Sequence, residues 1–542
     1  MAGSADKSGA AFRAGFFGCL VGGTAIGVTY LGHRIASLPY VPFDVFDWMA
    51  RALPGGLVVR SIETMVGIIR GLRLGPTAST AKLAEQGLAL FQFVVIWVVF
   101  GLILGLLGRR RRDRLSLYGT LGGSLLALAA FGIEWAGGFH EAGPLTTLLW
   151  LAAVLVGGGV LLGLMVMAGS APAEAQPGPT DSRRRFLYLV GTGSFVVMVT
   201  AAGVSILSRK GKKPSLEIDR DEIVRAGQTS GPAASPPAGE LEKRFPPVPG
   251  TRPEMTQSRD FYRIDINLQP PKIDGGTWRL KVEGLVERPL VLSLDDIRSK
   301  PRQTQALTLS CISNPVGGDL ISTNFWTGTP FKLLLEDAGL KKEVREIFIE
   351  SADGFYESVP LGEALDGRTL LVYEMNGEPL TADHGYPLRI FIPGHFGMKQ
   401  PKWIVRMEAI DRRGQGFWVD RNWSETARVR TTSVIDVAAP GDPDPQTGVV
   451  AVGGIAYAGD RGIGQVEVKV DRGEWEKAEL RTPPLSPLTW VQWRYSWKSS
   501  PGRHVFRVRA FDGEGHPQIT EDHPPFPDGA TGIHQRTAVI PR

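Results

Sequence analysis

The sequence predicts a chain of three parts: a bundle of five transmembrane helices, an α+β domain, and an all-β sandwich of roughly immunoglobulin size. Long uncharged runs of Leu, Val, Gly and Ala fill the chain up to residue 207, and charged, Pro-rich and Trp-rich sequence follows. Helix-like and strand-like segments are mixed over 257–430, whereas only strand-like segments separated by turns follow over 431–542. A chain of 542 residues is also too long for one domain.

The first part, residues 1–207, contains stretches that are long and apolar enough to cross a bilayer. They lie near 14–32, 87–108, 115–136, 145–168 and 186–207. Basic residues precede the first stretch and cluster at 109–114 and 183–185. The positive-inside rule then places the N-terminus in the cytoplasm and the C-terminal domains on the outer face. A four-span alternative leaves one basic cluster on the wrong side. We expect 53–74 to form an amphipathic helix on the outer surface.

The last stretch follows Ser182-Arg183-Arg184-Arg185-Phe186-Leu187, which fits the twin-arginine export motif at all its positions. A plain cytoplasmic charge anchor is the alternative. The motif implies export of a folded domain, which is needed when a cofactor is inserted in the cytoplasm. Because no convincing cleavage site follows, we expect the segment to remain as an anchor. Residues 208–256 are rich in Pro, Gly and Ser and predict a semi-extended linker.

Composition excludes several classes of function. The net charge of +5 comes largely from clusters that flank apolar runs, so it does not indicate nucleic-acid binding. Two cysteines cannot build an iron–sulfur cluster. None of the eight histidines lies in the middle of a predicted span, and the chain has no Cys-x-x-Cys-His motif. We therefore expect neither haem nor an iron–sulfur cluster in this chain.

Cys311 is the strongest candidate for a functional residue. The strand-like run 306–309 leads into a loop of Ser, Asn, Pro and Gly that begins at Cys311. Such an arrangement presents one side chain from a rigid scaffold. A lone thiolate is a nucleophile or a ligand for a soft metal, and the alternative is a cysteine that only packs in a core.

Several motifs follow one another around and after Cys311. They are Ser310-Cys311-Ile312-Ser313-Asn314, Ile321-Ser322-Thr323-Asn324-Phe325-Trp326-Thr327-Gly328, Tyr373-Glu374-Met375-Asn376-Gly377-Glu378-Pro379-Leu380, Asp383-His384-Gly385-Tyr386-Pro387-Leu388-Arg389, Pro393-Gly394 and Lys402-Trp403. In order and spacing they resemble the sulfite oxidase family of molybdopterin enzymes. The resemblance covers roughly 257–542, where 257–430 corresponds to the molybdopterin-binding catalytic domain and 431–542 to the dimerisation domain. The membrane part lies outside it.

The resemblance implies a molybdenum–molybdopterin cofactor, with Cys311 as the thiolate ligand of the metal. The pterin carries a phosphate and ring donors and acceptors, which suit charge-assisted hydrogen bonds. The residues implied for cofactor binding are Asn314, Asp353, His384, Arg389, Lys399 and Lys402. The resemblance also implies two arginines for a small anionic substrate, Arg263 and Arg461.

The sequence departs from the family pattern at two places. Animal and plant members carry arginine shortly after the cysteine, where this chain has Pro315-Val316. The active-site tyrosine of the family lies in a stretch like Asp-Tyr-Lys-Gly-Phe, and the matching stretch here is Arg413-Gly414-Gln415-Gly416-Phe417. Both departures leave the identity of the substrate open.

The leading hypothesis is a multi-pass membrane oxidoreductase whose catalytic domain faces the outside. It transfers an oxygen atom to a small oxyanion and passes electrons to a separate cytochrome or quinone. One alternative is a reductase of sulfoxides or another small oxo-substrate on the same centre. Another is a non-catalytic membrane scaffold. A homodimer through the C-terminal sandwich is a further expectation from the resemblance.

Overall fold

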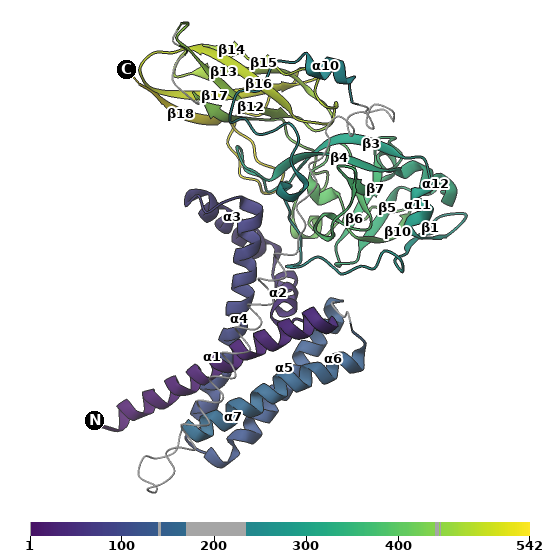
Figure 1. Ribbon diagram of the computed structural model, residues 1–542. Coiled ribbons are helices and arrows are strands. Elements are labelled where there is room, and N and C mark those ends of the chain that lie inside the picture. Colours follow the sequence, from purple (N-terminus) through teal and green to yellow (C-terminus); the bar gives the residue numbers. More distant parts are fainter. Residues whose placement is uncertain (1, 139–141, 170–234, 440–443, 445, 542) are drawn as a thin grey trace. The chain divides into compact units, whose positions relative to one another are not determined.

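The computed structural model describes the chain except for residues 1, 139–141, 170–234, 440–443, 445 and 542 (Figure 1). It contains two compact units. The first comprises Met1–Leu53 and Lys82–Pro214, and the second comprises Pro54–Ala81 and Ser215–Arg542. The predicted fifth span, the twin-arginine motif before it and the first part of the predicted linker lie outside the described residues.

The described part of the first unit is helical. Its elements are α1 (Ala2–Ala36), α2 (Val41–Ala52), α4 (Thr77–Gly108, whose first residues belong to the second unit), α5 (Leu115–Gly137), α6 (Pro144–Leu151), the π-helical turn η2 (Ala152–Val156) and α7 (Gly157–Gly169). Four helical segments are long and apolar enough to cross a membrane: Phe12–Ala36, Thr77–Gly108, Arg112–Gly137 and Pro144–Gly169. They contain the first four predicted stretches. A bent pair, α2 with α3 (Gly55–Gly71), is a further candidate by length and composition.

Glycines allow α5 and α7 to pack closely. A Cβ atom on Gly119 would lie 2.2 Å from the carbonyl oxygen of Gly159, and one on Gly163 would lie 2.5 Å from that of Leu115. Small residues that let helix backbones approach each other are typical of helix contacts in membranes. This packing supports the interpretation of the unit as a membrane bundle.

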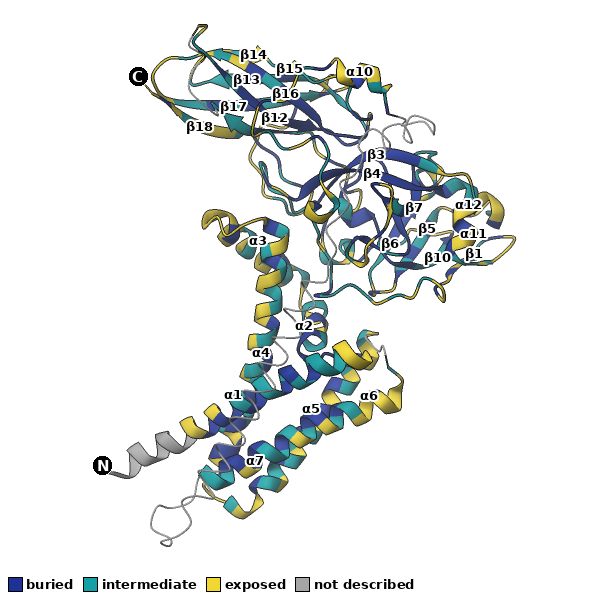
Figure 2. Cartoon of the chain, in the orientation of Figure 1, coloured by how far each residue is buried: buried dark blue, intermediate teal, exposed yellow. Residues whose placement is uncertain are grey.

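The second unit contains the predicted α+β domain, which is built on two sheets. One sheet has the strand order β2-β1-β10-β5-β6, and the other has the order β3-β4-β7-β8 with β9 paired to β7. The strands of the first sheet are β1 (Leu280–Gly284), β2 (Leu290–Leu292), β5 (Glu346–Ser351), β6 (Tyr356–Pro360) and β10 (Ile404–Ile410). Those of the second are β3 (Gln303–Ser310), β4 (Ile321–Pro330), β7 (Leu370–Met375), β8 (Glu378–Pro379) and β9 (Arg389–Phe391). Figure 2 shows β3 and β4 almost wholly buried.

Short helices connect these strands, as the sequence predicts. They are α11 (Leu294–Arg298), α12 (Phe331–Ala338), α13 (Leu361–Ala364) and the 3-10 turns η4 (Ala382–His384), η5 (Gly397–Lys399) and η6 (Val419–Arg421). Ser293 is the N-cap of α11, where Ser293 and Asp296 form a reciprocal capping box. Leucine residues of α12 pack in a core that also includes residues of β1 and β5 from the first sheet and of β7 and β9 from the second.

The C-terminal β domain consists of two four-stranded sheets, with the orders β11-β12-β16-β15 and β14-β13-β17-β18. The strands are β11 (Thr432–Ala438), β12 (Val449–Tyr457), β13 (Ile463–Val470), β14 (Trp475–Lys477), β15 (Glu479–Leu480), β16 (Val491–Lys498), β17 (Gly502–Asp512) and β18 (His534–Ile540). One core contains Val452 and Trp493 from the first sheet and Val468 and Phe506 from the second. The sheets therefore pack against each other, as expected for the strand-only part of the sequence.

The described part of the predicted linker does not form a free tether. Residues 235–256 contain the short helix α10 (Ala238–Glu242), and Leu241 packs with Phe325 and Leu485. Arg244 forms a buried ion pair with Glu254 at 2.5 Å. The Pro-rich composition predicts an extended chain, but specific side-chain contacts hold this segment on both domains of the second unit.

Helix α3 belongs to the second unit, although the sequence predicts it as part of the membrane domain. Val59 of this helix is buried in a core that includes Ile312 and Phe396. A Cβ atom on Gly55 would lie 3.0 Å from the Cα of Arg421, so the helix start also lies close to η6. The predicted amphipathic helix at 53–74 therefore exists, and its buried face lies against the α+β domain.

Candidate functional site

Cys311 follows the end of a buried strand. Strand β3 ends at Ser310, and residues 311–320, called the Cys311 loop below, connect it to β4. The backbone N–H of Cys311 donates to the carbonyl of Leu320 at 2.9 Å. Its Sγ lies 3.0 Å from the Oγ of Ser313, and the residue is buried. The predicted presentation of Cys311 by a rigid strand is confirmed.

The thiol of Cys311 lies in an environment that favours its neutral form. Burial raises its pKa, and hydrogen bonds from Ser313 and Ile312 oppose this shift. Desolvation penalises a thiolate that has no cation beside it. A soft metal ion that takes this thiolate as a ligand would therefore displace a proton.

Asn314 shapes the Cys311 loop. Its side-chain Oδ1 accepts from the backbone N–H of Leu320 at 3.0 Å, and its own N–H donates to the carbonyl of Cys311 at 3.1 Å. A Cβ atom on Gly318 would lie 2.2 Å from Asn314 Oδ1, so the loop needs glycine there. In these contacts Asn314 supports the loop, and its predicted contact with the cofactor stays a prediction.

Four predicted residues lie in one cluster of charges. His384 is the last residue of η4, and Arg389 is the first residue of β9. Arg263 lies in the segment before β1, and Lys402 lies just before β10. Asp265 accepts from both Arg263 and Lys402. The carboxylate of Asp383 accepts from Arg263 at 2.6 Å, and the carbonyl of Asp383 accepts from Lys402 at 3.2 Å. These two aspartates therefore balance two of the cations.

Arg389 is a third cation of this cluster, and neither Asp265 nor Asp383 forms an ion pair with it. It is buried, its Nη1 donates to the carbonyl of His384 at 3.2 Å, and its guanidinium lies 4.9 Å from the ring centre of Trp326. Within the described residues it forms no ion pair, and its Nε has no hydrogen-bond partner. Burial lowers its pKa to about 10, and Tyr262 and Asp265 oppose this shift. A buried charge without a partner is costly, so this site favours an anion.

His384 is held neutral beside these cations. Its Nε2 lies 3.1 Å from the carbonyl of Ser258, and its ring meets that of Phe261 edge to face at 5.5 Å. Burial, together with the charges of Lys402 and Arg389, lowers its pKa to about 4. The contact with a carbonyl assigns the remaining proton to Nε2, which leaves Nδ1 as an acceptor.

Lys399 and Asp353 are buried but lie in other local contacts. Lys399 pairs with the fully buried Glu357 at 2.8 Å, and burial raises the pKa of Glu357 while Lys399 opposes that rise. Asp353 turns the chain between β5 and β6, because its Oδ1 accepts from the N–H of Phe355 at 3.0 Å. The carbonyl of Asp353 accepts from Asn267 at 3.2 Å. Their predicted cofactor contacts are not tested by these bonds.

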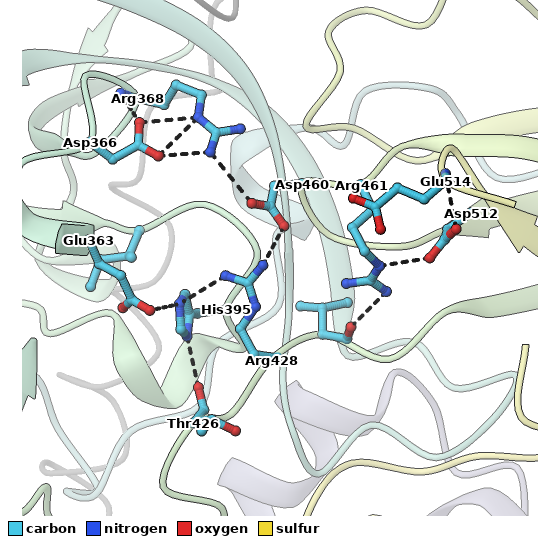
Figure 3. A network of polar contacts seen from close by, with 12 residues as sticks. Glu363, Asp366, Arg368, His395, Thr426, Arg428, Asp460, Arg461, Asp512 and Glu514 are labelled. Carbon is cyan, nitrogen blue, oxygen red and sulfur yellow. Dashed lines mark hydrogen bonds and ion pairs between the residues drawn. The ribbon is translucent and has the colours of Figure 1, made fainter. Parts of the chain in front are cut away.

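Arg461 lies in a network of its own (Figure 3). It pairs with Asp512 at 2.9 Å and donates to the carbonyl of Val429 at 3.2 Å and to the hydroxyl of Thr431 at 3.1 Å. Within the described residues no ion pair or hydrogen bond joins it to the cluster that contains Arg263. The structure thus gives Arg461 a role in the turn between β12 and β13, and a shared substrate pocket with Arg263 stays a prediction.

The residue before Arg461 connects the two domains of the second unit. Asp460 pairs with Arg428 at 2.9 Å and with Arg368 of the α+β domain at 3.5 Å (Figure 3). Arg428 lies 3.3 Å from His395 Nε2, which in turn lies 2.9 Å from Glu363. Salt bridges that share partners in this way hold the loop of Arg461 against the domain that carries Cys311.

Sequence reasoning missed Asp265, Asp383, Trp326 and Tyr262. Asp265 follows Arg263 by two positions and Asp383 precedes His384, so their nearness to predicted residues was a usable signal. No spacing rule indicates Tyr262. Its hydroxyl is buried without a hydrogen-bond partner, and a Cβ atom on Gly397 would lie 2.9 Å from it. Burial raises the pKa of Tyr262 well above its usual value, and the nearby Cys311 raises it further.

Comparison with known proteins identifies the fold of this site. Residues 267–418 match the oxidoreductase molybdopterin binding domain. The chain is 30% identical over 274 residues to sulfite oxidase from Arabidopsis thaliana, covering 41% of this chain and 70% of that protein. The chain belongs to the sulfite oxidase family. It is therefore a molybdenum-cofactor oxidoreductase by family, and the family predicted from the motifs is confirmed.

Two further known proteins are similar to part of this chain. Mitochondrial sulfite oxidase from Rattus norvegicus is 29% identical over 292 residues, which are 46% of this chain and 53% of that protein. The chain thus spans about half the length of that relative. The crystal structure of the sulfane dehydrogenase SoxCD from Paracoccus pantotrophus aligns with 61% of this chain and 96% of that chain, at 21% identity and a TM-score of 0.46.

Proposed function

We propose that this protein oxidises a small oxyanion, with sulfite as the leading substrate, at a molybdenum centre ligated by Cys311. In balanced form, sulfite and water give sulfate, two protons and two electrons. The electrons pass singly to a separate acceptor, a cytochrome or a quinone. When bound, the cofactor supplies the two-electron redox chemistry and the oxygen-atom transfer, and the protein supplies binding and orientation.

The observation that carries this proposal is the buried, unpaired Arg389 in the domain that presents Cys311. A cofactor that combines sulfur ligands with a terminal phosphate matches both residues, since a soft metal suits thiolate and a phosphate suits a guanidinium. Cys311 raises the pKa of the buried Tyr262 phenol and Arg389 lowers it, so both residues act on the same tyrosine. The residues present therefore fit molybdopterin.

The other residues would act on this cofactor and substrate in defined ways. Arg389 would neutralise the phosphate, and His384 would offer its neutral Nδ1 as a hydrogen-bond acceptor. Lys402 and Arg263 would bind anions only in competition with Asp265 and Asp383, which pair with them. Asn314 would keep the Cys311 loop in its shape. Asp353, Lys399 and Arg461 remain proposed contacts from the family resemblance.

Metal analysis of the detergent-purified chain, paired with an activity assay, tests the proposal. We expect molybdenum near one per chain and sulfite-dependent reduction of a cytochrome or dye. Cys311→Ser should abolish that activity without unfolding the protein, because serine keeps the size of the side chain. An active wild-type protein without molybdenum would overturn the proposal. Wild-type protein with neither molybdenum nor sulfite-dependent activity would favour the non-catalytic scaffold.

A reductase of sulfoxides is the second candidate. It is favoured by the Cys311 loop, in which Pro315-Val316 replaces the arginine that the family resemblance leads us to expect. The carbonyl of Val316 accepts from Arg70 at 3.4 Å, so the backbone at this position faces a cation from α3. Oxidation of a reduced dye by a sulfoxide, without sulfite-dependent reduction of an acceptor, would establish this direction.

The remaining proposals concern location and assembly. The apolar helices of the first unit would anchor the protein in the cell membrane, with the catalytic domain on the outer face. Export through the twin-arginine motif at 182–187 would carry the loaded domain across. The C-terminal β domain, as an immunoglobulin-like sandwich, would support a homodimer. Protease digestion of sealed membrane vesicles of known orientation tests the placement of the second unit.

A further inference from the structure

The hydroxyl of Tyr262 is a buried donor without a partner. Within the described part of the chain no atom completes a hydrogen bond to it. The buried hydroxyl of Tyr457 differs, since it donates to the carbonyl of Thr308 at 2.7 Å. Buried polar groups are nearly always hydrogen-bonded, and an exception indicates an unseen partner or a functional role.

The ring of Tyr262 is held in place around this hydroxyl. It stacks on Phe261 at 5.5 Å and 17°, and Phe261 in turn meets Trp326 edge to face at 5.3 Å. The backbone N–H of Tyr262 donates to the Oγ of Ser322 on β4 at 3.2 Å. These contacts hold the ring and the backbone of Tyr262, so the hydroxyl keeps its buried position.

This hydroxyl lies near the end of β3, the strand that precedes the proposed metal ligand. A Cβ atom on Gly397 would lie 2.9 Å from the phenol oxygen and 3.6 Å from the carbonyl of Ser310, the residue before Cys311. The thiol of Cys311 and the guanidinium of Arg389 both act on the phenol electrostatically. The phenol oxygen thus lies close to Gly397, at a position that is also near the carbonyl at the end of β3.

The segment that matches the family's tyrosine motif offers no phenol. Gly414 lies against the side chain of Ser358, where a Cβ atom would be 2.4 Å from Oγ. Gly416 lies against Glu357, where a Cβ atom would be 2.2 Å from Oε1. These glycines pack that segment tightly onto β6, and the segment brings no phenol to the site.

We propose that the hydroxyl of Tyr262 donates a hydrogen bond to an oxygen atom of the oxyanion substrate bound beside Cys311. A phenol is a neutral donor on a rigid ring, and its bond to an anionic oxygen is charge-assisted. Tyr262 thereby contributes to substrate affinity without adding a charge to the cluster of Arg389. This inference rests on the proposed function and names a substrate contact within it.

The test compares Tyr262→Phe with Tyr457→Phe in the full-length, cofactor-loaded protein. Sulfate serves as a non-reacting oxyanion, and its dissociation constant is measured by the shift in thermal unfolding. We expect Tyr262→Phe to weaken sulfate binding about tenfold or more and to raise the KM for sulfite similarly. Molybdenum content and the absorption spectrum of the substrate-free protein should stay unchanged. Tyr457→Phe should leave sulfate affinity unchanged.

Stability of the cofactor-free protein gives a second, independent measurement. Tyr262→Phe removes a buried donor that has no partner, so its melting temperature should equal or exceed that of the wild type. Tyr457→Phe removes a satisfied donor and should lower it. Equal sulfate affinity in Tyr262→Phe, loss of molybdenum from it, or destabilisation of its cofactor-free form would each overturn the inference. Wild-type protein without molybdenum would instead count against the proposed function.

Discussion

At the scale of single residues, the site depends on a charge balance that is incomplete by one. Arg263 and Lys402 pair with Asp265 and Asp383. Arg389 is buried, donates to a carbonyl, lies over an aromatic face and forms no ion pair within the described residues. A guanidinium over a tryptophan ring gains some attraction, but that does not replace the lost hydration of a full charge. The fold therefore stores an unfavourable charge that an anionic cofactor would relieve.

Arg389→Met tests this balance. Methionine fills a similar volume without charge, so the cofactor-free protein should be at least as stable as the wild type, by up to about 2 kcal/mol. The loaded variant should lose most of its molybdenum, which elemental analysis measures. Arg389→Lys is the matched control, because it keeps the charge but not the bidentate geometry and should retain part of the cofactor. Full molybdenum content in Arg389→Met would show that the phosphate lies elsewhere.

At the scale of elements, the Cys311 loop is held by segments that are remote in sequence. Arg70 donates to the carbonyl of Val316, and Asp319 accepts from the N–H of Thr77 at 2.7 Å. On another side, Gly317 lies against the ring of His534 in β18. Helix α3 and the last strand of the C-terminal β domain therefore both contact the loop that begins at the proposed metal ligand.

Gly317→Ala should disturb this loop strongly, although the substitution adds only one methyl group. Gly317 has a φ of 73°, and a Cβ atom there would lie 2.4 Å from the imidazole of His534. Left-handed backbone strain and the clash together should cost about 2–4 kcal/mol. Gly362→Ala in α13 is the control, because open space surrounds that position and alanine favours a helix. Thermal unfolding of both variants, with molybdenum content, distinguishes the two outcomes. Equal stability would contradict the packing described.

The elements around Cys311 were predictable, but their contacts were not. Local sequence patterns predicted the strand before Cys311 and the strands of the C-terminal β domain. Those signals are local, because the pattern of apolar residues within a strand reports only the burial of that strand. The contact of Arg70 with Val316 joins residues 246 positions apart, and no periodicity in one sequence reports such a pairing. The orphaned hydroxyl of Tyr262 was missed for the same reason.

At the scale of the whole molecule, the boundaries of the compact units differ from those predicted from composition. Composition changes near residue 208, yet the second unit also takes Pro54–Ala81 from the apolar half. The predicted linker likewise packs over 235–256, where Trp490 donates to the carbonyl of Glu254 at 3.0 Å. Composition reports the average environment of a segment, whereas unit boundaries follow individual contacts such as these.

The stability of the second unit should fall in mild acid. His534 accepts at Nδ1 from the N–H of Ile435 at 3.0 Å, and burial lowers its pKa to about 4. In the unfolded chain His534 has its usual pKa of about 6.5 and is protonated below that pH. In the folded chain it stays neutral down to about pH 4, so protons bind preferentially to the unfolded chain between these values. Stability should be lost as the pH falls from about 6.5 to 4, with no further loss from this group below that range. The charged residues that also act on it are Asp436, Arg536, Arg252 and Arg70.

His534→Gln should remove that part of the pH dependence. The difference in unfolding free energy between about pH 7 and about pH 5 should shrink by roughly 1–2 kcal/mol. His384, which also has a pKa of about 4, remains in the variant and leaves a residual dependence. Melting temperatures over that pH range measure the effect. An unchanged slope would mean that His534 titrates normally in the folded protein.

The last prediction concerns the carboxylate that ties the segment 235–256 to the second unit. Glu254 is buried and accepts from Arg244 at 2.5 Å and from Arg481 at 2.7 Å, so one charge serves two guanidiniums. Glu254→Gln would remove the anion that both guanidiniums share and should cost about 3–5 kcal/mol in unfolding free energy. Glu240→Gln, an exposed position on α10, should change stability by less than about 0.5 kcal/mol. If the two variants unfold alike, this segment contributes little to the fold, and its contacts do not set the boundary of the unit.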